Sequence, residues 1–228
     1  MKRLAVLIPA KDEEATIGEL LDRLYRVRIR GCEPYAIVVD DGSTDGTARM
    51  ARERGALMIR HEVNRGLGAA VRTGLRVAVG SGADLVAYLD ADLEYRPEDV
   101  PRLVEPVLAG RADYVLGSRF MGGGVKEMKL HRWIGNHCFT LLLVALTRRW
   151  MTDGQTGMRA FSREAAASAE IVHDYNYAQV LTLALLRKGF AFEEVPIRYS
   201  LREHGTSFIS WRYPAKVLPA IWRELRAP

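Results

Sequence analysis

The chain has 228 residues, of which 48% are hydrophobic and 27% are charged; this composition supplies a sizeable core and excludes disorder over most of the chain. The net charge is +5, with the basic excess in the second half, which suits an anionic partner such as a phosphate, a lipid headgroup or a nucleic acid, although a solvated basic face is an equal alternative. Two cysteines without ligand-like spacing exclude a disulfide framework, and no stretch reaches the about 20 apolar residues that a membrane span needs.

The first 118 residues alternate strand patterns with helix patterns. Five apolar runs predict strands, at 4–8, 36–39, 57–60, 85–89 and 114–116. Apolar residues at helical spacing predict three helices between them, at 17–27, about 44–54 and about 68–79. Such alternation is typical of right-handed crossovers. The predicted fold class is therefore α/β, with a mainly parallel central sheet flanked by helices.

After Gly117 the pattern changes. The triplet at 122–124 predicts a flexible loop. Helices are predicted from about 129 to 149, with a strongly apolar face and basic ends, and from about 177 to 188. Residues 192–200 predict a strand, which Pro196 places at an edge or a bulge.

Two carboxylates, Asp90 and Asp92, follow directly on the strand at 85–89. Ligands of open α/β sheets bind beyond the carboxyl ends of the strands. One-residue spacing on extended backbone sends both side chains the same way. Two or three oxygens there suit a hard divalent cation, Mg²⁺ or Mn²⁺. The alternative is a cap and a turn, because 97–99 begins a helix nearby.

Polar residues also follow the first two strands. Asp40 and Asp41 end the second strand, and the acidic loop 11–14 follows the first. A carboxylate at such a place can accept hydrogen bonds from a nucleobase or a ribose, whereas helix capping explains Ser43 and Asp45 equally well. Three polar strand ends at one sheet edge predict a ligand site there.

The ordered set of motifs resembles the family 2 glycosyltransferases of GT-A fold, the nucleotide-diphospho-sugar transferase fold. Within them it is similar to the dolichol-phosphate mannose synthases and other polyprenyl-phosphate glycosyltransferases. The segments that carry the resemblance are 9–14, 39–47, 64–68, 90–94, 117–120, 153–161 and 202–207.

The resemblance implies a role for each matching position. The nucleotide-sugar would be bound by Pro9, Lys11, Glu13, Val39, Asp41, Asp90, Ala91, Asp92 and Arg202. The metal would be held by Asp90, Asp92 and Glu94, with Glu94 in place of the Gln usual in this group. The acceptor phosphate would be held by Arg119, Arg132 and Asn136. The catalytic set would be Asp90, Asp92, Arg119 and Arg202.

The implied reaction is an inverting transfer of mannose, glucose or N-acetylglucosamine. The donor would be a GDP- or UDP-linked sugar and the acceptor a polyprenyl or dolichyl phosphate, with the enzyme peripheral on the cytoplasmic membrane face. An anionic phosphate acceptor needs no strong base, whereas a hydroxyl acceptor would need one, and Asp153 is the first candidate.

Residues 1–228 are expected to form one domain. Residues 1–118 would bind the donor, and residues 119–228, with a basic amphipathic C-terminal segment, would bind the acceptor. A family 2 enzyme with a soluble or saccharide acceptor is the first alternative. A sugar-phosphate nucleotidyltransferase is the second, although its loop after the first strand is usually basic rather than acidic. Paired acids at the strand ends disfavour a nucleic-acid binder.

Overall fold

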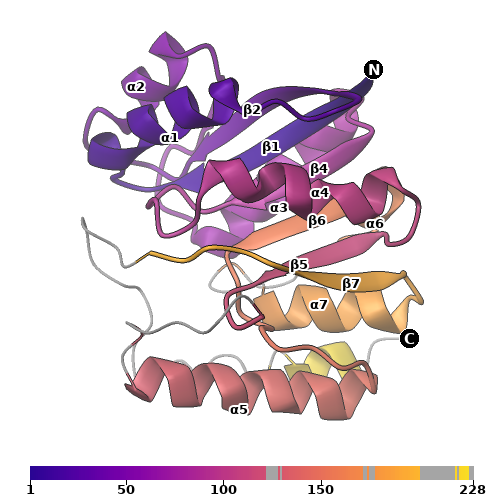
Figure 1. The fold of residues 1–228 in the computed structure, drawn as a ribbon. Helices are drawn as coiled ribbons and strands as arrows, with labels where there is room; N and C mark the ends of the chain where they lie inside the picture. The colour runs from indigo at the N-terminus through magenta and orange to yellow at the C-terminus, as the bar shows by residue number, and fades with distance from the viewer. Residues whose placement is uncertain are drawn as a thin grey trace.

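A seven-stranded sheet with helices on both faces organises the fold (Figure 1). The computed structural model describes residues 1–121, 128, 130–171, 174, 178–200, 219 and 221–225. The strands, in chain order, are β1 (Lys2–Ala10), β2 (Cys32–Asp40), β3 (Leu57–Arg60), β4 (Leu85–Leu89), β5 (Tyr114–Ser118), β6 (Met158–Ser162) and β7 (Phe192–Pro196). Their order across the sheet is β3-β2-β1-β4-β6-β5-β7. Of these described strands, only β6 runs antiparallel to its neighbours, so the prediction of a mainly parallel α/β sheet is confirmed.

Two hydrophobic cores cover the two faces of the sheet. Leu4, Val6 and Ile8 of β1 belong to one core, and Ala5 and Leu7 belong to the other. All five side chains are fully buried. Because successive side chains of a strand point to opposite faces, a strand covered on both sides is a continuous apolar run in the sequence.

The helices divide between these two cores. The core on one face takes side chains from α1 (Glu14–Arg26), α2 (Thr47–Glu53) and α4 (Val100–Leu108), which follows the short 3₁₀ helix η1 (Pro97–Asp99). The other core takes them from α3 (Leu67–Gly80), α5 (Leu130–Thr147), α6 (Arg163–Ala167) and α7 (Ala178–Arg187). Figure 1 shows α5 beyond α7, as the helix farthest from the sheet. Within the described residues, no helix combines the length and apolarity required to cross a bilayer.

The structure differs from the predictions in the extent of several elements and in one strand that was not predicted. Helix α2 begins at Thr47 rather than near residue 44, because the Asp45 carboxylate accepts the backbone N–H of Thr47 at 3.0 Å and forms a local turn. The strand expected at 192–200 ends at Pro196, and it lies at the sheet edge as expected. Strand β6 was not predicted as a strand; its residues Met158 and Phe161 are fully buried.

All seven described strands have one terminus at the same end of the sheet, called the sheet edge below. The six parallel strands finish there, and β6, which runs the other way, begins there, with Met158 opposite Leu89. The strand order reverses between β1 and β4, since β2 and β3 lie on one side of β1 and β4 lies on the other. This is where open α/β sheets bind their ligands.

Candidate functional site

The turn after β4 gathers three acidic residues: Asp90, Asp92 and Glu94. The backbone N–H of Glu94 donates to the Asp92 carboxylate at 3.1 Å. Leu93, between them, has φ +59°, a left-handed conformation that is uncommon for a residue with a side chain and is often found at functional sites. The turn thus holds its acids close together at the cost of backbone strain.

The electrostatics of this turn favour a cation. Burial, and then the negative charge of Asp92, raise the pKa of Asp90 to about 8. The same two causes, in the same order, raise the pKa of Glu94. The Tyr88 hydroxyl donates a hydrogen bond to Asp90, which offsets only part of this repulsion. A positive ion beside the three carboxylates would relieve the rest.

The donor set suits Mg²⁺ or Mn²⁺ shared with a ligand. Among the described residues, no group of three or more His, Cys, Asp or Glu side chains is arranged to enclose a metal by itself. Mg²⁺ seldom uses such a cage; it is bound by one or two carboxylates together with substrate phosphates. The acids of the 90–94 turn therefore fit a cation that a phosphorylated ligand helps to hold.

Gly157, just before β6, sets the place of the Asp90 carboxylate. A Cβ added to Gly157 would lie 1.8 Å from Asp90 Oδ2 and 2.6 Å from Tyr95 Cε2. The Gly157 N–H donates to the Tyr95 hydroxyl at 2.9 Å. Only a residue without a side chain leaves room for Asp90 here.

A buried ion pair joins Arg119, just after β5, to Asp153 in the loop between α5 and β6. Arg119 Nε lies 2.6 Å from Asp153 Oδ2, and its Nη2 lies 2.8 Å from Oδ1. Asn136 of α5 donates to the same carboxylate at 3.1 Å. Burial acts to raise the pKa of Asp153, but the Arg119 guanidinium outweighs it and holds this pKa below its ordinary value. Asp153 is therefore a poor proton acceptor.

Helix α5 reaches the acidic turn from the other side. Arg132 Nη1 lies 3.7 Å from Glu94 Oε1. The ring of Tyr199 lies over the Arg119 guanidinium, 5.5 Å from its carbon to the ring centroid, and contacts Tyr95 edge-on at 5.8 Å between ring centroids. Of the three residues predicted to hold the acceptor, Arg132 contacts the acidic turn through Glu94, whereas Arg119 and Asn136 both bind Asp153.

The loops after β1 and β2 are fastened to each other. The Glu13 N–H donates to Thr47 Oγ1 at 2.8 Å, and the Asp12 N–H donates to Ser43 Oγ at 2.9 Å. Lys11 forms an ion pair with Asp12. These contacts hold the predicted nucleoside loop in one conformation.

Pro9 and Val39 lie deeper in the sheet. They are partners across β1 and β2, and both are buried. The Val39 side chain belongs to the core over α3, so only its backbone could line a pocket.

Asp41, one residue beyond β2, is bonded through both of its carboxylate oxygens. Its Oδ1 lies 2.7 Å from His61 Nδ1 and accepts the Arg65 N–H at 2.9 Å, while its Oδ2 accepts the Gly66 N–H at 2.7 Å. His61 was not predicted as a site residue, because it lies 20 residues from Asp41 and no local pattern joins them. Arg202, which the resemblance places over the diphosphate, lies outside the described residues.

The predicted site residues follow the carboxyl ends of neighbouring strands, in a definite order across the sheet. Asp41 follows β2, Lys11 follows β1, Asp90 follows β4 and Arg119 follows β5. Adjacent strands are about 4.8 Å apart, so β2 and β4 are separated by about 10 Å. An extended ligand lying along this edge would meet the Asp41 loop first and the acidic turn next.

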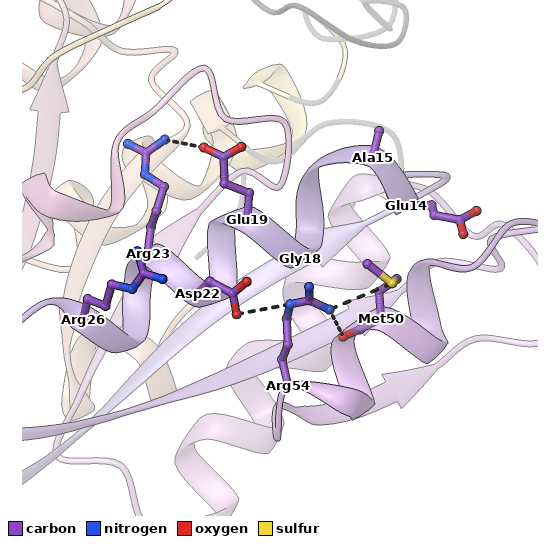
Figure 2. A pocket seen from close by; sticks show the side chains of 9 residues that line it. All are labelled: Glu14, Ala15, Gly18, Glu19, Asp22, Arg23, Arg26, Met50 and Arg54. Carbon is purple, nitrogen blue, oxygen red and sulfur yellow. Dashed lines mark hydrogen bonds and ion pairs between the residues drawn. The ribbon is translucent and has the colours of Figure 1, made fainter.

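A hollow of about 560 Å³ lies between α1 and α2, away from the acidic turn (Figure 2). Its charged side chains pair with one another: Arg54 Nε lies 3.2 Å from Asp22 Oδ1, and Arg23 Nη1 lies 3.1 Å from Glu19 Oε1. Of the loop 11–14 it includes only Glu14, and most of its charged side chains already take part in ion pairs. We therefore place the functional site at the sheet edge.

Known proteins are similar to this chain in sequence. Residues 5–168 match the family model described as glycosyl transferase family 2. The UDP-N-acetylglucosamine–dolichyl-phosphate N-acetylglucosaminyltransferase of Methanococcus voltae is 31% identical over 72% of this chain and 71% of that protein. The undecaprenyl-phosphate mannosyltransferase of Micrococcus luteus is 31% identical over 99% of this chain and 98% of that protein.

A solved structure has the same fold. Glucosyl-3-phosphoglycerate synthase from Mycobacterium tuberculosis, in complex with phosphoglyceric acid, superposes with a TM-score of 0.75. The two sequences are 23% identical, and the match covers 100% of this chain and 81% of the other. The chain has a GT-A-like fold and belongs to glycosyl transferase family 2.

Proposed function

We propose that this glycosyltransferase moves a sugar from a nucleotide-diphospho-sugar to a polyprenyl or dolichyl phosphate, in a divalent-cation-dependent reaction at a membrane surface. In this proposal, residues 1–118 bind the donor and residues 119–228 bind the acceptor. The donor would lie along the sheet edge, with its nucleoside at Lys11, Glu13 and Asp41.

The acidic turn would receive the diphosphate. Asp90, Asp92 and Glu94 would hold Mg²⁺ or Mn²⁺, which neutralises the charge that develops on the leaving nucleoside diphosphate. The raised pKa of Asp90 in the cation-free protein supports this assignment, because the turn is electrostatically incomplete by itself. By resemblance, Arg202 would contact the same diphosphate.

The state of Asp153 is the observation that carries the choice of acceptor. A hydroxyl acceptor must lose its proton to a base. Asp153, the candidate base at the acceptor side, is fully buried and bonded through both oxygens to Arg119. A phosphate acceptor arrives already ionised and needs no base, so it suits this site better. Arg132, with Arg119 and Asn136 behind it, would attract that phosphate.

The outer surface of α5 supports a lipid acceptor. Four large apolar side chains are exposed along it: Leu130 (71%), Trp133 (42%), Ile134 (48%) and Leu141 (60%). Arg148, Arg149 and the exposed Trp150 follow the helix directly. Apolar and Trp side chains flanked by arginines are typical of helices that lie in an anionic membrane surface. We therefore propose a peripheral membrane enzyme.

An apolar groove lies farther along the same helix. It has a volume of about 530 Å³ and is lined by Leu142, Leu146, Pro219, Ile221, Trp222 and Leu225. At 1.5 Å per residue, Leu146 lies about 20 Å along α5 from Arg132. A long isoprenoid chain could extend over this distance, whereas a small soluble acceptor would leave the groove empty.

The relatives agree with this acceptor class. The Methanococcus voltae and Micrococcus luteus proteins are named for dolichyl phosphate and undecaprenyl phosphate. The structurally similar synthase, by contrast, is named for phosphoglycerate, so a soluble acceptor is the competing outcome.

The product's solubility tests the proposal. Labelled UDP- and GDP-sugars would be incubated with the enzyme, Mg²⁺ or Mn²⁺ and polyprenyl phosphate vesicles, and the label partitioned between butanol and water. We expect label in butanol only when both the cation and the lipid phosphate are present. Label that stays in water as a new saccharide or sugar phosphate would reassign the acceptor.

A further inference from the structure

Glu194, on β7, is a half-buried carboxylate that lies outside the set of predicted site residues. It is opposite Leu116 of β5, and its side chain binds the loop that precedes β6. Its Oε2 accepts the Thr152 N–H at 2.8 Å, and its Oε1 accepts the Asp153 N–H at 3.0 Å. The carboxylate thus serves this loop as the carbonyl groups of a neighbouring strand would, and it fixes the backbone of Asp153.

A chain of hydroxyl groups also joins Glu194 to the turn after β5. Thr152 Oγ1 lies 3.2 Å from Glu194 Oε2 and 2.6 Å from Ser118 Oγ. Because an ionised carboxylate only accepts, the Thr152 hydroxyl donates to Glu194, and the Ser118 hydroxyl donates to Thr152. Ser118 Oγ in turn accepts the N–H groups of Phe120 and Met121, both at 3.2 Å. Glu194 therefore sets the direction of each hydrogen bond in this chain.

The two segments that Glu194 fixes carry the two members of one ion pair. Asp153 lies in the loop before β6, and Arg119 lies in the turn after β5. Asp153 occupies Nε and Nη2 of Arg119, whereas Nη1 makes no hydrogen bond to a described residue. Nη1 is not one of the buried polar atoms that lack a partner in the described part of the chain, so it reaches the surface. The guanidinium thus keeps one nitrogen for a ligand.

From this geometry we infer that Glu194 is a positioning residue for the acceptor. It directs Nη1 of Arg119 toward the acceptor phosphate, through Asp153 on one side and through Thr152 and Ser118 on the other. The inference rests on the proposed function, in which Arg119 holds that phosphate. Glu194 itself does not touch the acceptor.

The influence of Glu194 should be confined to the acceptor side. Among the residues that the structure describes, its side chain bonds only to Thr152 and Asp153, and to none of the acids of the 90–94 turn. Loss of the carboxylate would let the loop before β6 and the turn after β5 move independently. The Arg119 guanidinium would then lose its orientation, while the turn proposed to hold the cation keeps its own.

Glu194→Gln tests this inference, because it keeps the size of the side chain but turns one accepting oxygen into an amide that faces N–H donors. Calorimetric titration of the intact chain with farnesyl phosphate, a short polyprenyl phosphate, reports the acceptor side. Titration with UDP or GDP in the presence of Mn²⁺ reports the donor side. We expect the affinity for farnesyl phosphate to fall by about tenfold or more, since hydrogen bonds to a charged group are lost. The nucleoside diphosphate affinity should change by less than about twofold.

The neighbouring residue supplies the matched control. Glu193 lies on the same strand, points to the opposite face and pairs with Arg111 at 3.2 Å, so Glu193→Gln should leave both affinities unchanged. Thr152→Val is a second variant, which removes the hydroxyl link and keeps the N–H bonds to Glu194. It should weaken farnesyl phosphate binding alone, by less than Glu194→Gln does. If Glu194→Gln does not fold, Thr152→Val decides.

The outcomes separate the inference from the proposal beneath it. A merely structural role would weaken both kinds of ligand together. Unchanged binding of farnesyl phosphate, or equal weakening of farnesyl phosphate and nucleoside diphosphate, overturns the inference and leaves the proposed function in place. If the unaltered chain binds no farnesyl phosphate, or neither UDP nor GDP with Mn²⁺, the proposed function fails and the inference fails with it.

Discussion

Replacing Gly157 by alanine should displace the Asp90 carboxylate from the acidic turn. The added Cβ would lie 1.8 Å from Asp90 Oδ2, whereas non-bonded heavy atoms prefer about 3.5 Å or more. The carboxylate or the β6 backbone must therefore move by roughly 1.5 Å. Tyr95, whose Cε2 would lie 2.6 Å from the same Cβ, blocks movement on that side.

A shift of this size should matter more for catalysis than for folding. Misplacing a reacting or binding group by about 1 Å can reduce a rate by about 100-fold, and overpacking a well-filled site typically destabilises a protein by about 1–3 kcal/mol. We expect Gly157→Ala to reduce cation-dependent sugar transfer by about 100-fold. Its unfolding free energy should fall by no more than that range.

The assay measures sugar transfer over a series of Mn²⁺ concentrations, with urea unfolding in parallel. Gly80→Ala is the control, because a Cβ at Gly80, at the end of α3, meets no heavy atom within 4 Å. We expect that variant to retain full activity. Full activity and unchanged Mn²⁺ dependence in Gly157→Ala would refute the claim that the position of Asp90 matters.

Three further changes probe charge, burial and surface. Without a bound cation, burial and a neighbouring carboxylate raise the pKa of Asp90 to about 8. Between about pH 4 and 8 the native state therefore keeps a proton that the unfolded chain has lost. The unfolding free energy should fall with rising pH over this range, by up to about 1.4 kcal/mol per pH unit. Urea unfolding at a series of pH values should show a shallower fall of the unfolding free energy with pH for Asp90→Asn, or with Mn²⁺ added. An equal dependence on pH would contradict this. Asp153→Asn leaves the buried Arg119 guanidinium without its counter-ion, and should lower the unfolding free energy by about 3–5 kcal/mol; a loss below about 1 kcal/mol would mean that the pair is not buried in solution. Serine at both Trp133 and Leu141 should weaken co-sedimentation with anionic vesicles by about tenfold or more, with an unchanged circular dichroism spectrum; undiminished binding would show that α5 does not face the membrane.

The strands of the central sheet could be predicted because each is covered on both faces. Leu4–Ile8 and Leu85–Leu89 are unbroken apolar runs, and both are fully buried. Strand β6 could not be predicted in this way, because the charged residue Arg159 interrupts its apolar run. Its guanidinium is buried and donates to the Tyr114 hydroxyl and to the Thr156 and Gly154 carbonyls, a set of partners that only the folded chain provides.

The candidate site likewise has residues that the sequence predicts and residues that it does not. Asp41, Asp90 and Asp92 could be predicted because they follow directly on apolar strands. Their partners could not be predicted, because these come from distant segments: Gly157 packs on Asp90, and His61 bonds to Asp41. Local pattern locates a site at a sheet edge, whereas the fit of side chains within it depends on tertiary packing.

The acid pair itself admits the most direct test of the proposed reaction. Alanine at both Asp90 and Asp92 would remove two of the three proposed cation ligands, and label transfer from the nucleotide-sugar to lipid phosphate would be followed with and without a chelator. Asp84→Ala, at the opposite end of the sheet, serves as the control. We expect the double variant to lose about 1,000-fold in turnover, since a catalytic cation contributes several kcal/mol. Turnover and cation dependence equal to those of the unaltered chain would contradict a cation-assisted departure of the nucleoside diphosphate.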